Sequence, residues 1–452
     1  MADPALYRRV WRWHFYAGLL VLPFVLLLSV TGAIYLFKPQ IDRWEERAYH
    51  GPAGGAPVSP DAQLAAALAA HPGSRFVHYR LPERAGDAAM VRLALPSGEA
   101  AEVFVSPAGD VLGTLAPEGR ISPTVARLHG SLLMGTWGDR LVELAASWTI
   151  VLIVSGLYLW WPRPFRAAGT LWPRLSLRGR PLLRDIHRVT GFWIAGLVLV
   201  MLASGLPWAG VWGSAFKWAR AELGLVEGPQ EWKIGSGAAP AQAHDHAHGP
   251  AAPAAKVPAA KVPAATGAAP GGALPLSAVV ARARAERLAF PALVLPPHAP
   301  QAFGPPTGNE WTATSMTQNR PRALTVTYDP ATGAETGRRG FADKHPIDRA
   351  VGYGIAWHEG QLFGLANQLI GLATAIALIA VSLLGAWMWW KRRPRGQLAA
   401  PPRVEHRAGW GLRALVIALA ILLPLFALSL VAVLILDRAA TAWRGKRRVA
   451  SA

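Results

Sequence analysis

The sequence predicts a polytopic α-helical membrane protein built from duplicated two-helix units. We expect four core membrane helices, a fifth membrane helix near the C-terminus, and two small α+β modules inserted between helices. Three observations predict this architecture. The 452 residues are 52% hydrophobic and only 16% charged. Several apolar runs are long enough to cross about 30 Å of hydrocarbon. Histidine, glycine and tryptophan landmarks also recur at fixed spacing.

The first repeat is centred on His129 and His358. After each histidine, glycines follow at offsets of 6 and 27, and two tryptophans follow at offsets of 31 and 32. These landmarks are Gly135, Gly156, Trp160 and Trp161 in the first copy, and Gly364, Gly385, Trp389 and Trp390 in the second. Four landmarks held in register over this distance indicate an internal duplication.

A second pair of histidines, His14 and His187, shows the same behaviour. Each is followed by glycines at offsets of 4 and 18, with Thr31 and Ser204 immediately before the later glycine. These glycines are Gly18, Gly32, Gly191 and Gly205. The two units therefore each carry two histidines, and we expect one histidine on each of the four core membrane helices.

The predicted order of segments follows from the apolar runs and the loops between them. In chain order they are an N-terminal tail with the first membrane helix (1–38), a first module (39–125), a second membrane helix (126–161), a loop (162–186), a third membrane helix (187–215), a second module (216–350) containing a disordered linker (235–273), a fourth membrane helix (351–390), a loop (391–409), a fifth membrane helix (410–437) and a tail (438–452).

Each module reads as one short helix followed by short strands. In the first module Ser59 is a candidate helix N-cap before Pro60. The expected strands there are 76–81, 89–95, 101–106 and 111–115. In the second module we expect a helix over 276–288 and strands over 311–316 and 323–328.

Charge distribution predicts the orientation in the membrane. The net charge of +19 comes largely from cations beside apolar runs, which favours the positive-inside pattern over nucleic-acid binding. Arginines before the first helix and in the 162–186 loop place both on the cytoplasmic side. The fifth helix, taken as a single crossing, would place its cationic tail outside, against that trend. The chain has no cysteine, which excludes disulfides and thiolate metal sites within it.

The four repeated histidines predict a cofactor site. Ionisable side chains at membrane depth are costly and tend to mark function, and imidazole is a usual axial ligand of b-type haem. Both units start inside, so an axis along the membrane normal relates them. We therefore expect His14 to face His187 near the cytoplasmic side and His129 to face His358 near the outer side, with one haem b between each pair.

Other residues enter this hypothesis as supporting groups or alternatives. Arg12, Arg184 and Arg188 are candidate partners for the propionates of the inner haem. The repeated glycines either leave room for a flat macrocycle or only allow close helix packing. Zinc is a competing interpretation, but it requires tetrahedral clustering, and only Glu359 lies beside one of the histidines. The linker residues His244, His246 and His248 either bind a divalent metal or simply belong to a solubilising segment.

The chain resembles the PepSY-associated transmembrane family of bacterial inner-membrane proteins linked to iron uptake. The matching pieces are His14-x3-Gly18 with Thr31-Gly32, His187-Arg188-x2-Gly191 with Gly205-Leu206-Pro207-Trp208, Trp357-His358-Glu359-Gly360 with Phe363-Gly364, and Trp389-Trp390 before Lys391-Arg392-Arg393-Pro394. The resemblance implies PepSY-like modules in the periplasm and a haem-binding reductase, in some members acting on ferric siderophores.

These observations lead to one functional hypothesis and two alternatives. We expect a di-haem b oxidoreductase of the inner membrane that passes electrons to a periplasmic ferric chelate. No nucleotide-binding motif is present, so the donor would be a cytoplasmic flavin or NAD(P)H reductase, free reduced flavin, or quinol. The first alternative is a non-redox regulator whose modules bind a periplasmic protein. The second, a transporter of the chelate, is weakened by the scarcity of polar residues in the core helices beyond Asn367 and Gln368.

Overall fold

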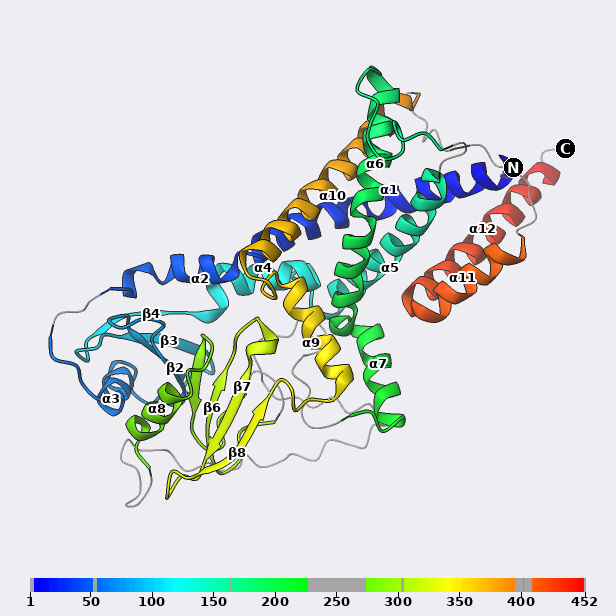
Figure 1. Cartoon of the computed structure of the whole chain (residues 1–452). Helices are drawn as coiled ribbons and strands as arrows, with labels where there is room; N and C mark the ends of the chain where they lie inside the picture. Colours follow the sequence, from blue (N-terminus) through cyan, green and yellow to red (C-terminus); the bar gives the residue numbers. More distant parts are fainter. Residues whose placement is uncertain are drawn as a thin grey trace.

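A computed structural model of the chain describes residues 4–51, 55–161, 165–226, 274–301, 305–394, 401 and 409–450. It consists of a bundle of long helices with a β-sheet body at one end (Figure 1). Residues 235–273 of the expected linker, including its three histidines, lie outside the described residues.

Among the described residues, four helices are long and apolar enough to cross a membrane. They are α1 (Pro4–Tyr35), α5 (Gly135–Trp160), α6 (Gly179–Gly205, extended by a 3₁₀ turn to Trp208) and α10 (Leu365–Arg392). Helix α1 packs against α5 and α10, and α6 packs against the same two helices. This ring places α1 and α6, which carry His14 and His187, at opposite corners of the bundle.

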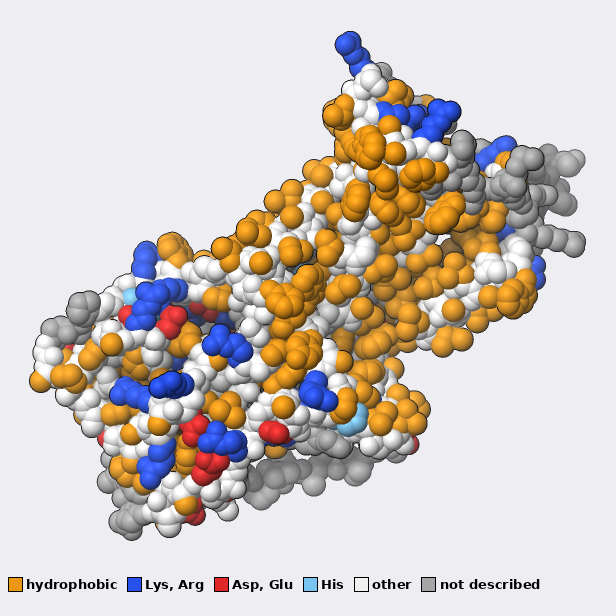
Figure 2. Space-filling view, in the orientation of Figure 1, with side chains coloured by type: hydrophobic (Ala, Val, Ile, Leu, Met, Phe, Trp, Pro, Cys, Tyr) orange, Lys and Arg blue, Asp and Glu red, His pale blue; other side chains and the backbone are white. Residues whose placement is uncertain are grey.

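The surface of these helices matches a hydrocarbon environment. Large apolar side chains such as Leu20, Leu369 and Ile376 are at least half exposed. Figure 2 shows a broad hydrophobic band over the helices, whereas charged side chains gather on the sheet body and near the opposite end of the bundle. Lipid, rather than water, is the solvent that such a band requires.

The first insert forms the elements that the sequence predicts. Helix α2 (Lys38–Glu45) follows α1, and α3 (Pro60–Ala70) begins after Ser59, whose hydroxyl accepts a hydrogen bond from the Ala62 amide. The strands are β1 (Arg75–Arg80), β2 (Ala89–Ala94), β3 (Ala100–Val105) and β4 (Val111–Leu115). All four predicted strands are confirmed within two residues.

The second insert contains more than the sequence predicts. Helix α7 (Gly210–Glu222) precedes the undescribed stretch, α8 (Leu276–Ala285) follows it, and β6 (Trp311–Ser315) and β7 (Leu324–Tyr328) confirm the two expected strands. Two strands were not predicted: β5 (Ala292–Leu295) and β8 (Glu335–Gly340). Strand β5 is only four residues long, and β8 is an exposed edge strand without the apolar alternation that marks a strand in sequence.

The two inserts share one antiparallel sheet rather than forming separate modules. Its strand order is β4-β3-β2-β1-β5-β6-β7-β8, and the junction pairs Tyr79 of β1 with Val294 of β5. One apolar core runs across the junction, with α3 and α8 packed beside each other on the sheet. Val91, Val103 and Val326 from both halves are fully buried in this core. The inserts therefore fold as one body.

Two short helices connect the sheet body to the membrane helices. Helix α4 (Ile121–Ser131) leads into α5, and α9 (Pro346–His358) leads into α10. Helix α4 packs against α1 and α5, and α9 packs against α6. These helices carry His129 and His358, so those two histidines precede the spanning helices. The expectation that all four histidines lie on spanning helices is therefore wrong for this pair.

The single continuous helix expected over 410–437 is also wrong, because the chain forms two helices there. The chain forms α11 (Trp410–Leu422), breaks at Leu423, and continues as α12 (Pro424–Ala450). Proline at 424 cannot donate the backbone hydrogen bond of a continuous helix and clashes with the preceding turn, which explains the break. Helices α11 and α12 pack together as a hairpin, and in Figure 1 the C-terminal end of α12 lies at the same end of the bundle as the start of α1.

Candidate functional site

The two sheet-side histidines, His129 and His358, meet between α4 and α9. Their ring centroids are 6.3 Å apart, and the ring planes are inclined by 74°. The indole of Trp208, at the end of the α6 span, contacts His358 edge-on with a centroid distance of 5.6 Å. The structure thus brings together the two histidines that the sequence pairs at this level. We call them the sheet-side pair.

The turns after these two helices have the same backbone requirement. Gly135 and Gly364, each six residues after its histidine, have φ values of +57° and +58°. This left-handed region is costly for residues with a Cβ, which explains glycine at both positions. The preceding Leu132 and Leu133 also have positive φ, at 53° and 57°. The sharp turn lets each histidine point into the bundle from a helix that does not itself cross it.

Hydrogen bonds fix the rings of the sheet-side pair through Nδ1. His358 Nδ1 lies 2.9 Å from the carbonyl oxygen of Met201, and His129 Nδ1 lies 2.9 Å from the hydroxyl of Thr31. A carbonyl only accepts, so His358 Nδ1 must carry a proton. The Thr31 hydroxyl donates to the carbonyl of Leu27, so it accepts from His129 Nδ1.

The other two histidines, His14 on α1 and His187 on α6, are held in the same way. His187 Nδ1 lies 3.0 Å from the carbonyl oxygen of Val381 on α10. His14 Nδ1 lies 2.9 Å from the hydroxyl of Ser155 on α5, which itself donates to the Leu152 carbonyl. We call His14 and His187 the tail-side pair.

Four of the repeated glycines lie directly beneath the four imidazoles. A Cβ added at Gly32, Gly156 or Gly205 would stand 3.2 Å from the Cε1 of His129, His14 or His358 respectively. At Gly385 the corresponding distance to His187 is 3.5 Å. These glycines therefore make room for the imidazole rings. Gly191 is different, because an added Cβ would meet no atom within 4 Å.

The environment of the sheet-side pair favours neutral imidazole. Burial, followed by the neighbouring His358, lowers the pKa of His129 to about 4. Burial also lowers the pKa of His358. Neutral imidazole with a proton on Nδ1 has its lone pair on Nε2, which is the form that binds a metal.

The three candidate arginines occupy different environments at the tail side. Arg188 donates from Nη2 to the carbonyl of Trp160 at 3.3 Å, and its Nε is buried without a hydrogen-bond partner. Arg12 donates to the carbonyl of Pro401 and to the hydroxyl of Tyr16. Arg184 is exposed. Of the three, Arg188 has the unused donor that an incoming anion would satisfy.

No described residues form a group of three or more histidine, cysteine, aspartate or glutamate side chains that could hold a metal ion. Zinc in a protein site takes three or four such ligands, so the described residues do not supply the cluster that the zinc interpretation needs. Two opposed imidazoles suit a metal whose other positions are filled by a macrocycle.

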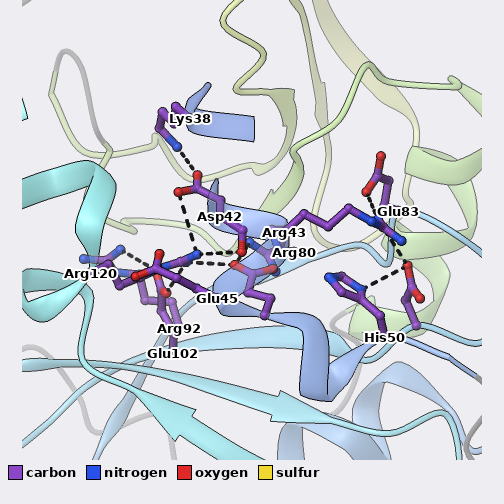
Figure 3. Close-up of polar contacts among 12 residues, drawn as sticks. Lys38, Asp42, Arg43, Glu45, His50, Arg80, Glu83, Arg92, Glu102 and Arg120 are labelled. Carbon is purple, nitrogen blue, oxygen red and sulfur yellow. Dashed lines mark hydrogen bonds and ion pairs between the residues drawn. The ribbon is translucent and has the colours of Figure 1, made fainter. Parts of the chain in front are cut away.

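Sequence reasoning missed a network of charges between α2, β3 and the start of α4. Figure 3 shows Arg120 at its centre, with the carboxylates of Asp42, Glu45 and Glu102 around it. Arg120 is only 8% exposed. The signal was present in the sequence as three acidic residues, Asp42, Glu45 and Glu46, at the end of α2, but Arg120 is more than seventy residues away in the chain.

The sequence of the chain was compared with models of known protein families. The family described as the PepSY-associated TM region matches residues 11–392. The chain belongs to that family. The match spans the four membrane helices, all four histidines and the sheet body, and it ends where α10 ends. This PepSY-associated TM protein is therefore a multi-pass membrane protein, and the α11–α12 hairpin lies beyond the matched region. No curated protein matches the chain.

Proposed function

We propose that this PepSY-associated TM protein is a di-haem b oxidoreductase that passes single electrons across the bacterial inner membrane to a ferric chelate on the sheet side. Four observations support the proposal: the shared tautomer of the histidines, the separation of the sheet-side pair, the donor left free on Arg188, and the repetition of the site in both halves of the chain.

The shared tautomer is the observation that carries the proposal. All four Nδ1 atoms donate to backbone carbonyls or to hydroxyls whose own protons are already used. Within the described residues, the hydrogen bonds of these rings involve Nδ1, so each Nε2 keeps its lone pair. Metal-binding histidines are commonly oriented in this way, by an acceptor for the other ring nitrogen. A structural histidine has no need to leave the same atom free at four related places.

The spacing of the sheet-side pair fits one iron atom between the rings. Metal–nitrogen bonds to imidazole are about 2 Å long, and each nitrogen lies about 1 Å from its ring centre, giving roughly 6 Å between centroids. The observed value is 6.3 Å. His14 and His187, from opposite corners of the bundle, would hold the second haem, with Arg188 positioned for a propionate.

We propose further that the two halves of the membrane bundle arose by duplication. The contacts of His14 and His129 with Gly156 and Gly32 recur as those of His187 and His358 with Gly385 and Gly205. A duplicated unit with one histidine at each level gives two ligand pairs at two depths. Electron transfer across a membrane needs such a series of sites.

When bound, the haems would supply one-electron chemistry. The protein's own residues would hold each ring through Nδ1, which leaves Nε2 available to a metal, and burial keeps the sheet-side rings neutral. The sheet body, which we assign to the periplasm, would hold the ferric chelate. Reduction of Fe(III) to Fe(II) weakens binding by hard oxygen ligands and releases the metal. Electrons would come from a cytoplasmic flavin or NAD(P)H reductase, free reduced flavin, or quinol.

The test is haem stoichiometry on purified full-length protein, in the wild type and in each of four variants: His14→Ala, His129→Ala, His187→Ala and His358→Ala. We expect two haems per chain in the wild type. His129→Ala and His358→Ala should lose the same haem, and the other two variants should lose the other. Wild-type protein without haem, prepared from cells supplied with iron and porphyrin precursor, would sink the proposal and favour a regulator that acts through its sheet.

A further inference from the structure

Each sheet-side histidine lies on a short helix whose start is held by a buried arginine and its carboxylate partners, which we call a clamp. Arg120 is the N-cap residue of α4, nine positions before His129. Arg220, on α7, contacts Asp348 in the first turn of α9, ten positions before His358. Arg120 is 8% exposed and Arg220 is 2% exposed. In each case about 14 Å of helix separates the clamp from the histidine, at about 1.5 Å per residue.

The Arg120 clamp uses every nitrogen of its guanidinium group. Nε lies 3.2 Å from a Glu45 oxygen, Nη1 lies 2.8 Å from Glu46 and 3.0 Å from Glu102, and Nη2 donates to the Asp42 carbonyl at 3.3 Å (Figure 3). Although burial opposes it, the carboxylates of Glu102 and Glu46 raise the pKa of Arg120. The guanidinium thereby joins α2, β3 and the start of α4.

The same acidic residues of α2 also form direct hydrogen bonds with the first turn of α4. Glu45 accepts a hydrogen bond from the Ile121 amide at 2.9 Å, and Asp42 accepts one from the Ser122 hydroxyl at 2.6 Å. Helix α2 therefore satisfies one backbone amide at the N-terminus of α4 that has no partner within the helix, and it also binds a side-chain hydroxyl in the same turn. Since α2 follows α1 directly, the start of α4 is fixed to the membrane bundle.

The Arg220 clamp is a bidentate pair. Its two terminal nitrogens lie 2.9 and 2.8 Å from the two carboxylate oxygens of Asp348. Nε and Nη2 also donate to the carbonyl of Leu225, at 3.2 and 2.7 Å. Parallel hydrogen bonds of this kind fix direction as well as distance. The start of α9 is thereby fixed to α7, the helix that follows the α6 span.

We infer that Arg120 and Arg220 are positioning residues that set the separation and orientation of His129 and His358. The inference rests on the proposed haem function, because it concerns the axial ligands of the sheet-side haem. The tail-side histidines need no such device, since they lie within continuous spanning helices. The sheet-side histidines stand at the far ends of short helices, where a small tilt at the start becomes a displacement of the ring.

The first test is a redox titration of purified full-length protein carrying Arg120→Gln or Arg220→Gln. The sheet-side haem, identified as the one lost in His129→Ala, should change its midpoint potential or be lost, while the tail-side haem keeps its potential as an internal reference. A tenfold change in the relative affinity for the two iron oxidation states corresponds to 59 mV for one electron, and we expect at least that shift.

Matched variants separate positioning from general damage. Arg338 also bridges two carboxylates, those of Glu286 and Glu335, but it is exposed on the sheet body. Arg338→Gln should leave both potentials unchanged. Arg120→Lys keeps the charge but not the fork geometry, so it should give an intermediate shift. Exchanging the partners, as Arg220→Asp with Asp348→Arg, should restore the sheet-side potential toward that of the wild type.

A measurement without haem distinguishes failure of this inference from failure of the haem proposal. The chain has no cysteine, so Leu133→Cys and Tyr353→Cys allow spin labels to be placed at two exposed positions beside α4 and on α9. The distance distribution between the labels should broaden in Arg120→Gln and in Arg220→Gln. An unchanged distribution, or an unchanged sheet-side potential in both variants, overturns the positioning role, whatever haem the wild type contains.

Discussion

His129 and His358 approach from different helices and are held by acceptors on different spans. The Thr31 hydroxyl on α1 fixes the His129 ring, and the Met201 carbonyl on α6 fixes the His358 ring. Because α1 and α6 lie at opposite corners of the bundle, the two rings are turned independently. The outcome is a 74° angle between their planes. Orientation is thus a property of the bundle and not of the short helices alone.

This angle predicts a spectroscopic signature. Two imidazoles with nearly perpendicular planes on one low-spin ferric haem give a strongly anisotropic electron paramagnetic resonance signal. Thr31→Val removes the acceptor for His129 Nδ1, so the ring should turn, the anisotropy should fall, and haem affinity at that site should drop by about tenfold. The spectrum of ferric protein checks this. Thr374→Val is a suitable control, since the Thr374 hydroxyl donates to the Ile370 carbonyl of its own helix.

Filling the space beneath an imidazole should displace it. In Gly205→Ala, the new methyl group would stand 3.2 Å from His358 Cε1, closer than ordinary contact, so the ring must shift. We expect sheet-side haem content to fall by about tenfold, the scale found for disturbed metal-ligand orientation. Gly196→Ala on the same helix would meet no atom within 4 Å. Equal haem loss in both variants would contradict the steric explanation.

The sheet body should lose stability in mild acid because of His78. Burial, followed by Arg92 and Arg80, lowers the pKa of His78 to about 3, whereas the unfolded value is about 6.5. The unfolded chain therefore binds the proton first as the pH falls. The contribution of neutral His78 to the free energy of unfolding is fully present above pH 6.5 and declines between pH 6.5 and pH 3. The decline is less than about 1.4 kcal/mol per pH unit, because His78 is partly exposed to solvent.

Pulse proteolysis of the full-length protein across this pH range checks the expectation. His78→Gln should flatten the pH dependence of sheet-body unfolding, whereas His298→Gln, at an exposed position, should leave it unchanged. An identical acid response in wild type and His78→Gln would show that another group controls it.

The C-terminal hairpin predicts on which side of the membrane the C-terminus lies. Helix α11 has 13 residues, or about 20 Å, which is short of the roughly 30 Å needed to cross. Trp148 Nε1 donates to Ser429 and Trp212 Nε1 donates to the Leu422 carbonyl, so the hairpin is docked on the bundle. Reporter fusions at the N-terminus and at the C-terminus should therefore report the same compartment. Opposite compartments would mean that the segment crosses after all.

Several features of this protein could be predicted from residue patterns alone. Apolar length identifies α1, α5, α6 and α10, because the requirement to span hydrocarbon acts on each helix separately. The strands β1–β4 follow from local alternation and turn residues. The histidines could be singled out because their spacing to glycine is repeated, and the glycines at 135 and 364 mark a backbone conformation that only local sterics decide.

Only the tertiary structure decided how these pieces meet. The pairing of Tyr79 with Val294 joins two inserts into one sheet, and no local pattern encodes a contact between strands more than two hundred residues apart. The Arg120 network and the Nδ1 acceptors are also long-range, as is the docking of the α11–α12 hairpin. Local sterics and hydrophobic length act within a segment, so sequence reveals them. Hydrogen bonds and ion pairs between distant segments depend on the complete fold, and they determine where each histidine ring points.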